Sequence, residues 1–404
     1  MRIQLWSYNF DPEPTGIGIV SGTLARGLRD RGHEVSVVAA HPHYPEPRWG
    51  HRLIPYREQQ AGIRVLRLPL WTGRATTAER YRQELTFTAA QSAATPFLGT
   101  PDVLISASPS FAALLPAVAN VRLRRVPWVL WLHDLLPDGA TATHLVPEGG
   151  LVISMARKLE RTAYRTADRI VVLSQALVGR LADKGVPRNK VDVIYDPATR
   201  APGALAAPST AGGLTLLSMG NIGRSQGLTS VVRAFESRPD LVGQARLRIT
   251  GTGVAADEAR REIRSDRVTM LGLIDGTQLE AELQGADVGL VSQRFEGTEF
   301  NFPSKLMNFM TYGLPVLAAV NPAGEVARVV RESGGGWVAD SSRPESFPLE
   351  VARLLQAPDE LIERAQAARR YAQRHFSSEL FVERFEQTLE RVVHAHAARS
   401  SVAT

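Results

Sequence analysis

A glycine-rich turn in the second half of the chain has the residue types of a phosphate-binding site. Residues 219–228 read Met-Gly-Asn-Ile-Gly-Arg-Ser-Gln-Gly-Leu and lie between an apolar run, 214–218, and a helical pattern that begins near Thr229. Glycines let the backbone approach a phosphate closely, while Arg224 and the positive end of the following helix supply positive potential. The segment therefore predicts a phosphate site at a strand-to-helix turn.

A histidine and an aspartate follow a predicted buried strand in the first half. The strand is expected at 128–132, and His133 and Asp134 come directly after it. Open α/β sheets bind ligands at the carboxyl ends of their strands. An imidazole there can hydrogen-bond a sugar hydroxyl or carry a proton, with the aspartate fixing the orientation of the ring. The position and the pairing favour a functional histidine over a structural one.

A second glycine turn, with Gly16 and Gly18, follows the first predicted strand. Such a turn is part of the dinucleotide-binding fingerprint. However, the loop 9–15 separates strand and glycines, and the second strand ends without a carboxylate for a ribose, so a nicotinamide cofactor is not expected. Two interpretations remain. Backbone amides meet a phosphate or an acceptor here, or the glycines serve only as a turn and helix start.

A lysine in the first turn of a predicted helix also indicates a bound anion. Ser304 is expected as the N-cap or a first-turn residue, and Gly313 as the glycine that follows the helix. Lys305 lies where the helix macrodipole disfavours a cation, in a chain with only four lysines among 47 basic residues. A bound anion would offset that penalty, although an exposed first-turn lysine would give the same sequence.

The chain lacks the sequence motifs of several other kinds of catalysis. There is no Asp-x-Asp and no His-Glu-x-x-His, and the histidines are scattered, so no metal site is expected. No Walker loop is present, which argues against P-loop ATP use. The chain has no cysteine, which fits a reducing cytoplasm.

Charge and hydropathy indicate a soluble protein with an anionic partner. The net charge is +6, with a sequence pI of about 9.8, and basic residues are spread along the chain rather than gathered in a nucleic-acid-binding arm. No signal peptide and no membrane-spanning run are expected. We therefore predict a cytoplasmic protein that binds no nucleic acid. Peripheral contact with the inner membrane face through 121–128 is an alternative, but a solvated helix end followed by a buried strand is favoured there.

Strand-length apolar runs alternate with helix-length amphipathic segments along the chain, which predicts an α/β fold with two doubly wound parallel sheets. We expect a first domain at 1–198, a linker rich in Pro, Ala and Gly at 199–213, and a second domain at 214–375. The final apolar stripe, 376–397, is expected to return to the first domain, and no order is expected after it. The predicted strands are 3–8, 35–40, 65–70, 103–107, 128–132, 170–173, 191–195, 214–219, 247–250, 268–271, 288–291, 316–320 and 336–339.

Taken together, five segments resemble the retaining glycosyltransferases of the GT-B fold, family 4, and within it the group acting on bacterial surface polysaccharides and secondary metabolites. They are the glycine loop at 12–18, Ala-Asp-Arg-Ile-Val-Val-Leu-Ser at 167–174, the segment 185–194, Gly-Asn-Ile-Gly-Arg at 220–224, and Pro-Ser-Lys…Gly-Leu-Pro-Val at 303–316. The combination is specific, and it spans nearly the whole chain.

The resemblance implies two Rossmann-like domains facing a central cleft and the transfer of a sugar from a nucleoside-diphosphate sugar, UDP- or GDP-linked. The acceptor would be a small molecule or lipid-linked, the anomeric configuration would be retained, and no cofactor or metal would be needed beyond the nucleotide sugar as co-substrate. Because no carboxylate is placed as an obvious nucleophile, front-face substitution is favoured. The oligomeric state stays open.

The resemblance also implies roles for individual residues. His133 and Asp134 would act as catalytic residues near the donor sugar, and Arg224 and Lys305 would neutralise the leaving diphosphate. Gly251 and Gly253 would lie near the nucleobase. The full set of implied donor-binding residues is Gly16, Gly18, Gly220, Asn221, Gly223, Gly251, Gly253, Phe302, Ser304, Leu306 and Asn308.

Two departures from the family pattern keep other functions open. The family usually has a basic residue where this chain has Gln226, and its Glu-x7-Glu signature would fall on Phe300 and Asn308. Asn308 could still hydrogen-bond a ribose, but without charge. The alternatives are a nucleotide-sugar 2-epimerase of the same fold and a non-catalytic binding subunit, since fold alone does not decide activity.

Overall fold

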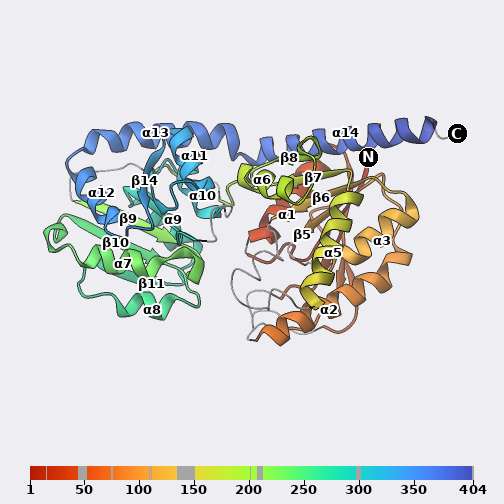
Figure 1. The fold of residues 1–404 in the computed structure, drawn as a ribbon, viewed down its shortest axis with the longest axis horizontal. Coiled ribbons are helices and arrows are strands. Elements are labelled where there is room, and N and C mark those ends of the chain that lie inside the picture. The colour runs from red at the N-terminus through yellow and green to blue at the C-terminus, as the bar shows by residue number, and fades with distance from the viewer. Residues whose placement is uncertain are drawn as a thin grey trace. The chain divides into compact units, whose positions relative to one another are not determined.

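Two units of α/β structure make up the chain (Figure 1). The first consists of Met1–Asp196 with Ser378–Thr404, and the second of Pro197–Ser377. The computed structural model describes all residues except 15, 44–51, 74–75, 109, 111, 134–150, 201, 207–212, 297–301 and 403–404. The predicted fold class, two Rossmann-like units with parallel sheets, is confirmed.

The first unit has an eight-stranded sheet with the order β3-β4-β2-β1-β5-β6-β7-β8, in which only the edge strand β3 is antiparallel to its neighbour. The prediction missed β3. Its sequence, Tyr-Arg-Glu-Gln-Gln, has no apolar run because both faces of this edge strand are polar. The strands are β1 (Arg2–Ser7), β2 (Glu34–Ala40), β3 (Tyr56–Gln60), β4 (Ile63–Leu68), β5 (Val103–Ser108), β6 (Trp128–Leu132), β7 (Arg169–Val172) and β8 (Val191–Val193).

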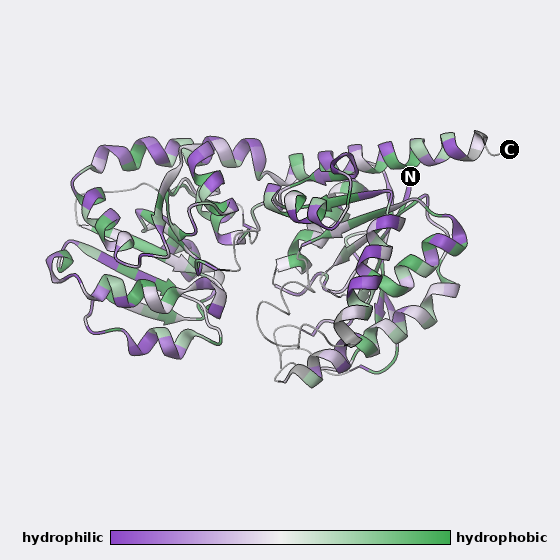
Figure 2. Ribbon diagram, viewed as in Figure 1, coloured by the Kyte–Doolittle hydropathy of each residue, from purple (hydrophilic) through white to green (hydrophobic). Residues whose placement is uncertain are grey.

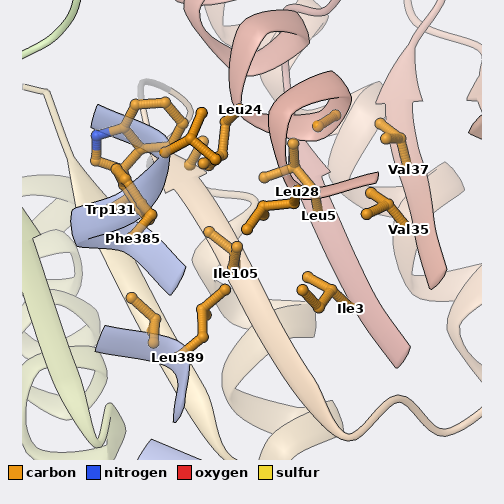
Figure 3. Close-up of a cluster of buried hydrophobic side chains, with 14 of the residues drawn as sticks. Ile3, Leu5, Leu24, Leu28, Val35, Val37, Ile105, Trp131, Phe385 and Leu389 are labelled. Atoms are coloured by element: carbon orange, nitrogen blue, oxygen red, sulfur yellow. The ribbon is translucent and has the colours of Figure 1, made fainter. Parts of the chain in front are cut away.

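Helices on both faces of this sheet build the core of the unit. Alternate residues of the strands, among them Ile3 and Ile105, point toward α1 and α14 (Figure 3). From α14, Phe385 and Leu389 enter the same cluster, which is why the C-terminal helix belongs to this unit. The helices are α1 (Gly16–Asp30), α2 (Thr77–Ala94), α3 (Leu114–Arg124), α5 (Leu151–Thr166), α6 (Gln175–Asp183) and α14 (Ser378–Val402).

Helix α14 extends further than the sequence predicted. It alternates hydrophobic and hydrophilic residues along its length (Figure 2), and it continues to Val402 rather than ending at Ala397. Beyond the apolar stripe, an ion pair holds its last turns, since the Arg399 guanidinium lies 2.6 Å from the Asp168 carboxylate. The prediction of no order after 397 was therefore wrong. Periodicity of apolar residues does not detect a helix end held by charge.

The second unit has a fully parallel six-stranded sheet with the order β11-β10-β9-β12-β13-β14. Strand order reverses between β9 and β12, and open sheets of this kind bind ligands at the carboxyl ends of the strands beside such a point. The strands are β9 (Leu214–Met219), β10 (Ala245–Thr250), β11 (Val268–Gly272), β12 (Val288–Ser292), β13 (Val316–Val320) and β14 (Gly336–Asp340). The helices are α7 (Leu228–Glu236), α8 (Ala256–Arg261), α9 (Gly276–Gln284), α10 (Ser304–Thr311), α11 (Glu325–Ser333), α12 (Ser346–Leu355) and α13 (Pro358–His375).

The chain passes from one unit to the other between Asp196 and Pro197 and again after Ser377. Described residues of the segment predicted as a linker, 199–213, make hydrogen bonds inside the second unit. The backbone N–H of Gly203 donates to the Glu280 carboxylate at 3.0 Å, and that of Ala206 to the Tyr312 carbonyl at 3.0 Å. These residues are thus part of the second unit.

Candidate functional site

The glycine turn of the second unit leaves the carboxyl end of β9. Gly220 has a φ of +95°, which reverses the chain there. Its N–H donates to the Thr250 carbonyl at 3.0 Å, and the Ile222 N–H donates to Thr252 at 2.8 Å. These two bonds attach the turn to the loop after β10. The turn is therefore held by a neighbouring loop before any ligand binds.

Gly251 and Gly253 allow this close approach of two backbones. A Cβ atom on Gly251 would lie 1.9 Å from the Gly220 carbonyl oxygen, and one on Gly253 would lie 2.4 Å from that of Ile222. Any side chain at either position would push the loops apart. The structure thus assigns both glycines to the support of the turn, and their predicted place near a nucleobase stays a prediction.

Arg224 places an exposed positive charge on this turn. It lies in the short 3-10 helix Arg224–Gln226, and its side chain is exposed. Within the described part of the chain its guanidinium has no hydrogen bond and no ion pair. Asn221, on the same turn, is also exposed. Both side chains can meet a ligand without first breaking a contact inside the protein.

Lys305 reaches the same turn from helix α10. Its side chain is only 6% exposed, and its Nζ donates to the Gln226 Oε1 at 2.5 Å. Burial lowers the pKa of this ammonium group from 10.5 to about 8. The alternative of an exposed first-turn lysine was therefore wrong. The contact also explains Gln226, because a basic residue there would place a second cation against the ammonium group.

The first turn of α10 brings further predicted residues to this place. Ser304 is exposed and is the first residue of the helix, whose N-cap is Pro303 without a side-chain hydrogen bond. Ser304 is therefore a first-turn residue and not the N-cap. Gly313, with a φ of +76°, follows the C-cap Tyr312, as predicted.

Two other predicted donor-binding residues are buried. The Leu306 side chain is fully buried, and its N–H donates to the Pro303 carbonyl at 3.1 Å. The Leu306 side chain therefore packs in the interior, and its part in donor binding stays a prediction. Phe302 is 9% exposed, with its ring centroid 6.0 Å from that of Phe376, so it anchors the segment that leads into α10.

The side chain of Asn308 is hydrogen-bonded within the protein, to a partner that the sequence did not indicate. Its side chain is 5% exposed, and its Oδ1 accepts from the Thr199 N–H at 3.0 Å. A second hydrogen bond, at 3.1 Å, joins its Nδ2 to the Thr199 hydroxyl. The amide therefore fixes the start of the second unit to α10. A contact with a ribose would require this pairing to open.

We expect Asn308→Ala to lower the free energy of unfolding of the second unit by about 1 to 3 kcal/mol, because the partly buried Thr199 N–H loses its acceptor. Asn308→Asp keeps an acceptor oxygen and should lose less. Urea unfolding of the two variants measures the difference. Equal loss in both would show that the Thr199 contact adds little to stability.

His133 lies at the carboxyl end of β6 in the first unit. Its side chain is 12% exposed, and its Nε2 is 3.6 Å from the Oδ2 of Asp196, whose side chain is 15% exposed. The His133 ring is 4.5 Å from that of Trp131. Burial lowers the pKa of the imidazole to about 3, against a smaller opposite effect of the Ser108 carbonyl, so the ring is neutral at pH 7. Asp134 lies outside the described residues.

Asp196 is a candidate site residue that the sequence reasoning missed. Asp196 comes shortly after the end of β8, and His133 comes directly after the end of β6. These two strands lie on either side of β7 in the sheet. The signal was present, because Asp196 stands just after a predicted strand and before Pro197, at the edge where ligands bind. Burial raises the pKa of its carboxyl group to about 7.

The two glycines at the start of α1 have different surroundings. Gly16 is the first residue of the helix, has a φ of +43°, and has open space where a Cβ would lie. At Gly18 a Cβ would lie 3.1 Å from the Glu13 carbonyl oxygen. The buried Glu13 carboxylate accepts from the His43 N–H at 2.7 Å and from Asn9 at 2.8 Å. Gly18 therefore packs under a fixed loop, while the backbone at Gly16 is open to a ligand.

Two α/β units, each built on a largely parallel sheet, are the architecture of the GT-B class of glycosyltransferases. Residues 15–197 match the glycosyl transferase 4-like domain, and residues 213–357 match the glycosyl transferases group 1 domain. The chain belongs to this family, glycosyltransferase family 4, and is a glycosyltransferase.

Individual relatives agree with this assignment. A protein of Escherichia coli K12 named as a colanic acid biosynthesis glycosyl transferase, WcaI, is 26% identical over 412 aligned residues, covering 95% of this chain and 98% of WcaI. The fold is similar to that of sucrose-phosphate synthase from Thermosynechococcus elongatus, with a TM-score of 0.73, 18% identity, and coverage of 98% of this chain and 100% of that one. Anabaena HepE, solved with UDP and glucose, gives a TM-score of 0.71, 16% identity, and coverage of 97% and 100%.

The described residues contain neither a metal-binding cluster nor a membrane-spanning helix. No group of three or more His, Asp or Glu side chains is arranged to hold a metal ion. Among the helices of the same residues, none combines the length and the apolar character needed to cross a bilayer.

Proposed function

We propose that the protein transfers a sugar from a nucleoside-diphosphate sugar, UDP- or GDP-linked, to an acceptor hydroxyl with retention of the anomeric configuration. The observation that carries the proposal is a glycine turn after a β-strand with two cations: the exposed Arg224, which has no partner among the described residues, and the buried Lys305, which bonds Gln226 of the same turn. Open backbone and two cations suit a diphosphate better than they suit a neutral ligand. The structures of HepE with UDP and glucose support this choice of donor.

The proposed reaction is a front-face substitution. The bond between the anomeric carbon and the diphosphate oxygen breaks, the acceptor oxygen attacks from the same side, and the acceptor proton passes to the leaving diphosphate. Negative charge grows on that diphosphate as the bond breaks. Arg224 and Lys305 would stabilise this charge, and stabilisation by preorganised groups is usually the largest catalytic contribution.

The acceptor is proposed to be a small molecule or a lipid-linked sugar of surface polysaccharide or natural-product synthesis. The similarity to WcaI supports the polysaccharide alternative. We place the reaction in the cytoplasm, and peripheral membrane contact through 121–128 is the less favoured alternative. At 121–128, helix α3 ends at Arg124 and the buried β6 begins at Trp128, as the favoured interpretation predicted.

A thermal-shift screen with UDP, GDP and dTDP tests the proposal first. One of the first two nucleotides should raise the melting temperature, and the rise should grow with the logarithm of its concentration once the site is saturated. Incubation with the matching nucleotide sugars, followed by NMR, then separates the alternatives. Epimerised donor in the absence of acceptor would establish the 2-epimerase, and binding without any turnover across a panel of acceptors would establish the binding subunit.

Activity should be unchanged by EDTA, because in the proposed mechanism the protein's own cations neutralise the leaving group. Initial rates before and after chelation measure this. Strong inhibition that Mg²⁺ or Mn²⁺ reverses would contradict the metal-free mechanism.

Binding of UDP should be coupled to proton uptake above about pH 8. Burial lowers the pKa of Lys305 to about 8, and an adjacent anion would raise it, so part of the lysine population takes up a proton on binding between that pH and the raised value. Calorimetry at about pH 8.5 in two buffers of different ionisation enthalpy measures the uptake. Lys305→Met should abolish it, and the same uptake in that variant would assign the proton to another group.

A further inference from the structure

The buried pair of His133 and Asp196 has hydrogen-bonding capacity that the described residues do not use. Both ring nitrogens of His133 and the Oδ1 of Asp196 are inaccessible to solvent and have no hydrogen-bond partner there. A buried polar atom without a partner costs free energy, and such groups concentrate at functional sites. The separation of 3.6 Å between Nε2 and Oδ2 is slightly too long for a hydrogen bond, and bonds of this kind often shorten when a ligand closes the site.

The surroundings of the pair are apolar. The His133 ring lies on Trp131, and Trp131 is in turn contacted by Phe381 and Phe385 of α14, at centroid distances of 5.7 and 4.9 Å. Among the described residues, burial is the cause of the shift in the Asp196 pKa, and burial with the Ser108 carbonyl accounts for that of His133. Within that part of the chain, no charged side chain contributes to either shift. What links the two groups is their geometry, since Nε2 and Oδ2 lie 3.6 Å apart.

We propose that Asp196 is a positioning residue that selects the tautomer of His133. When Asp196 is ionised, its carboxylate accepts the Nε2 proton, and Nδ1 is left as an acceptor. When Asp196 is protonated, its O–H donates to Nε2, and the single ring proton lies on Nδ1, which then donates. The ring stays neutral in both states.

The inference deepens the proposed function, and it rests on that function only for the role of Nδ1. A sugar hydroxyl can accept or donate a hydrogen bond, so the state of Asp196 would decide which of the two His133 offers to it. Because burial raises the Asp196 pKa to about 7, the exchange of tautomers should fall in the neutral range.

Nitrogen-15 NMR of the whole protein labelled in histidine tests the proposal without substrate. His133→Gln identifies the His133 signals. Between about pH 5.5 and 8.5, Nδ1 should change from a protonated to an unprotonated nitrogen and Nε2 should change in the opposite sense, with a midpoint near the Asp196 pKa. In Asp196→Asn this exchange should be absent, because the amide does not ionise.

A second carboxylate–histidine pair in the same unit gives the matched control. The Glu386 carboxylate lies 2.8 Å from the His33 Nε2, so Glu386→Gln should alter the His33 signals and leave the His133 exchange unchanged. The proposal is overturned by His133 signals that do not change with pH, by protonation of both ring nitrogens, or by the same exchange in Asp196→Asn. If that variant does not fold, the wild-type titration still decides between a tautomer exchange and its absence. Failure of sugar transfer would affect none of these signals.

Discussion

Replacing Arg224 with alanine is expected to lower kcat/KM for sugar transfer about 100-fold or more, because the leaving diphosphate loses a charge-assisted hydrogen bond that strengthens as the bond to the sugar breaks. The side chain is exposed and makes no hydrogen bond or ion pair with another described residue, so the substitution should leave the melting temperature unchanged. Most of the loss should appear in kcat rather than in KM, since the contact is strongest in the transition state.

Arg246 provides the control for this experiment. It is also an exposed arginine of the second unit without a partner among the described residues, but it lies near the start of β10, away from the carboxyl ends of the strands. Arg246→Ala should keep the wild-type rate, which would exclude a general effect of lost positive charge. Unchanged rates in both Arg224→Ala and Lys305→Met would remove the diphosphate assignment.

Phe385→Ala is expected to lower the free energy of unfolding of the first unit by about 3 to 5 kcal/mol, the usual cost of removing a buried phenylalanine. The Phe385 side chain is fully buried, and its ring lies 4.9 Å from that of Trp131 and 5.0 Å from that of Phe381. Hydrogen exchange followed by mass spectrometry measures the loss, because peptides from β1 and β6 should exchange faster while those of the second unit should not.

The exposed Glu390 on the same helix gives the control, and Glu390→Ala should leave exchange unchanged. Deletion of residues 378–404 should have a larger effect than Phe385→Ala, because it also removes Leu389 and Val392 from the core cluster. A soluble, fully active chain without these residues would contradict the role that we give to α14.

Sequence patterns predicted the buried strands best. Strands 128–132, 214–219 and 316–320 match β6, β9 and β13 to the residue, because a strand buried on both faces is a continuous apolar run. The polar edge strand β3 has no such run and was missed. The last turns of α14 lie beyond the apolar stripe, where Arg399 pairs with Asp168, so the periodicity of apolar residues does not reveal them.

The sequence predicted individual residues of the candidate site but not the hydrogen bonds between them. The glycine turn and the helix start supplied Arg224 and Lys305, since each follows from a local pattern. The partner of Lys305 lies 79 residues away in the sequence, and that of Asn308 lies 109 away. Such pairings depend on how loops from separate strands meet at one sheet edge. Local spacing carries no information about them.

The return of α14 to the first unit determines the order in which the two units can be completed during synthesis. A ribosome completes the sheet of the second unit at Asp340 and its helix α13 at His375, before Phe385 and Leu389 exist. The first unit, although made first, lacks part of its core until α14 has been made. The usual order of domain folding, from the N-terminus onward, is therefore reversed for the final step. Until α14 emerges, the nascent first unit exposes an apolar surface of the kind that chaperones bind.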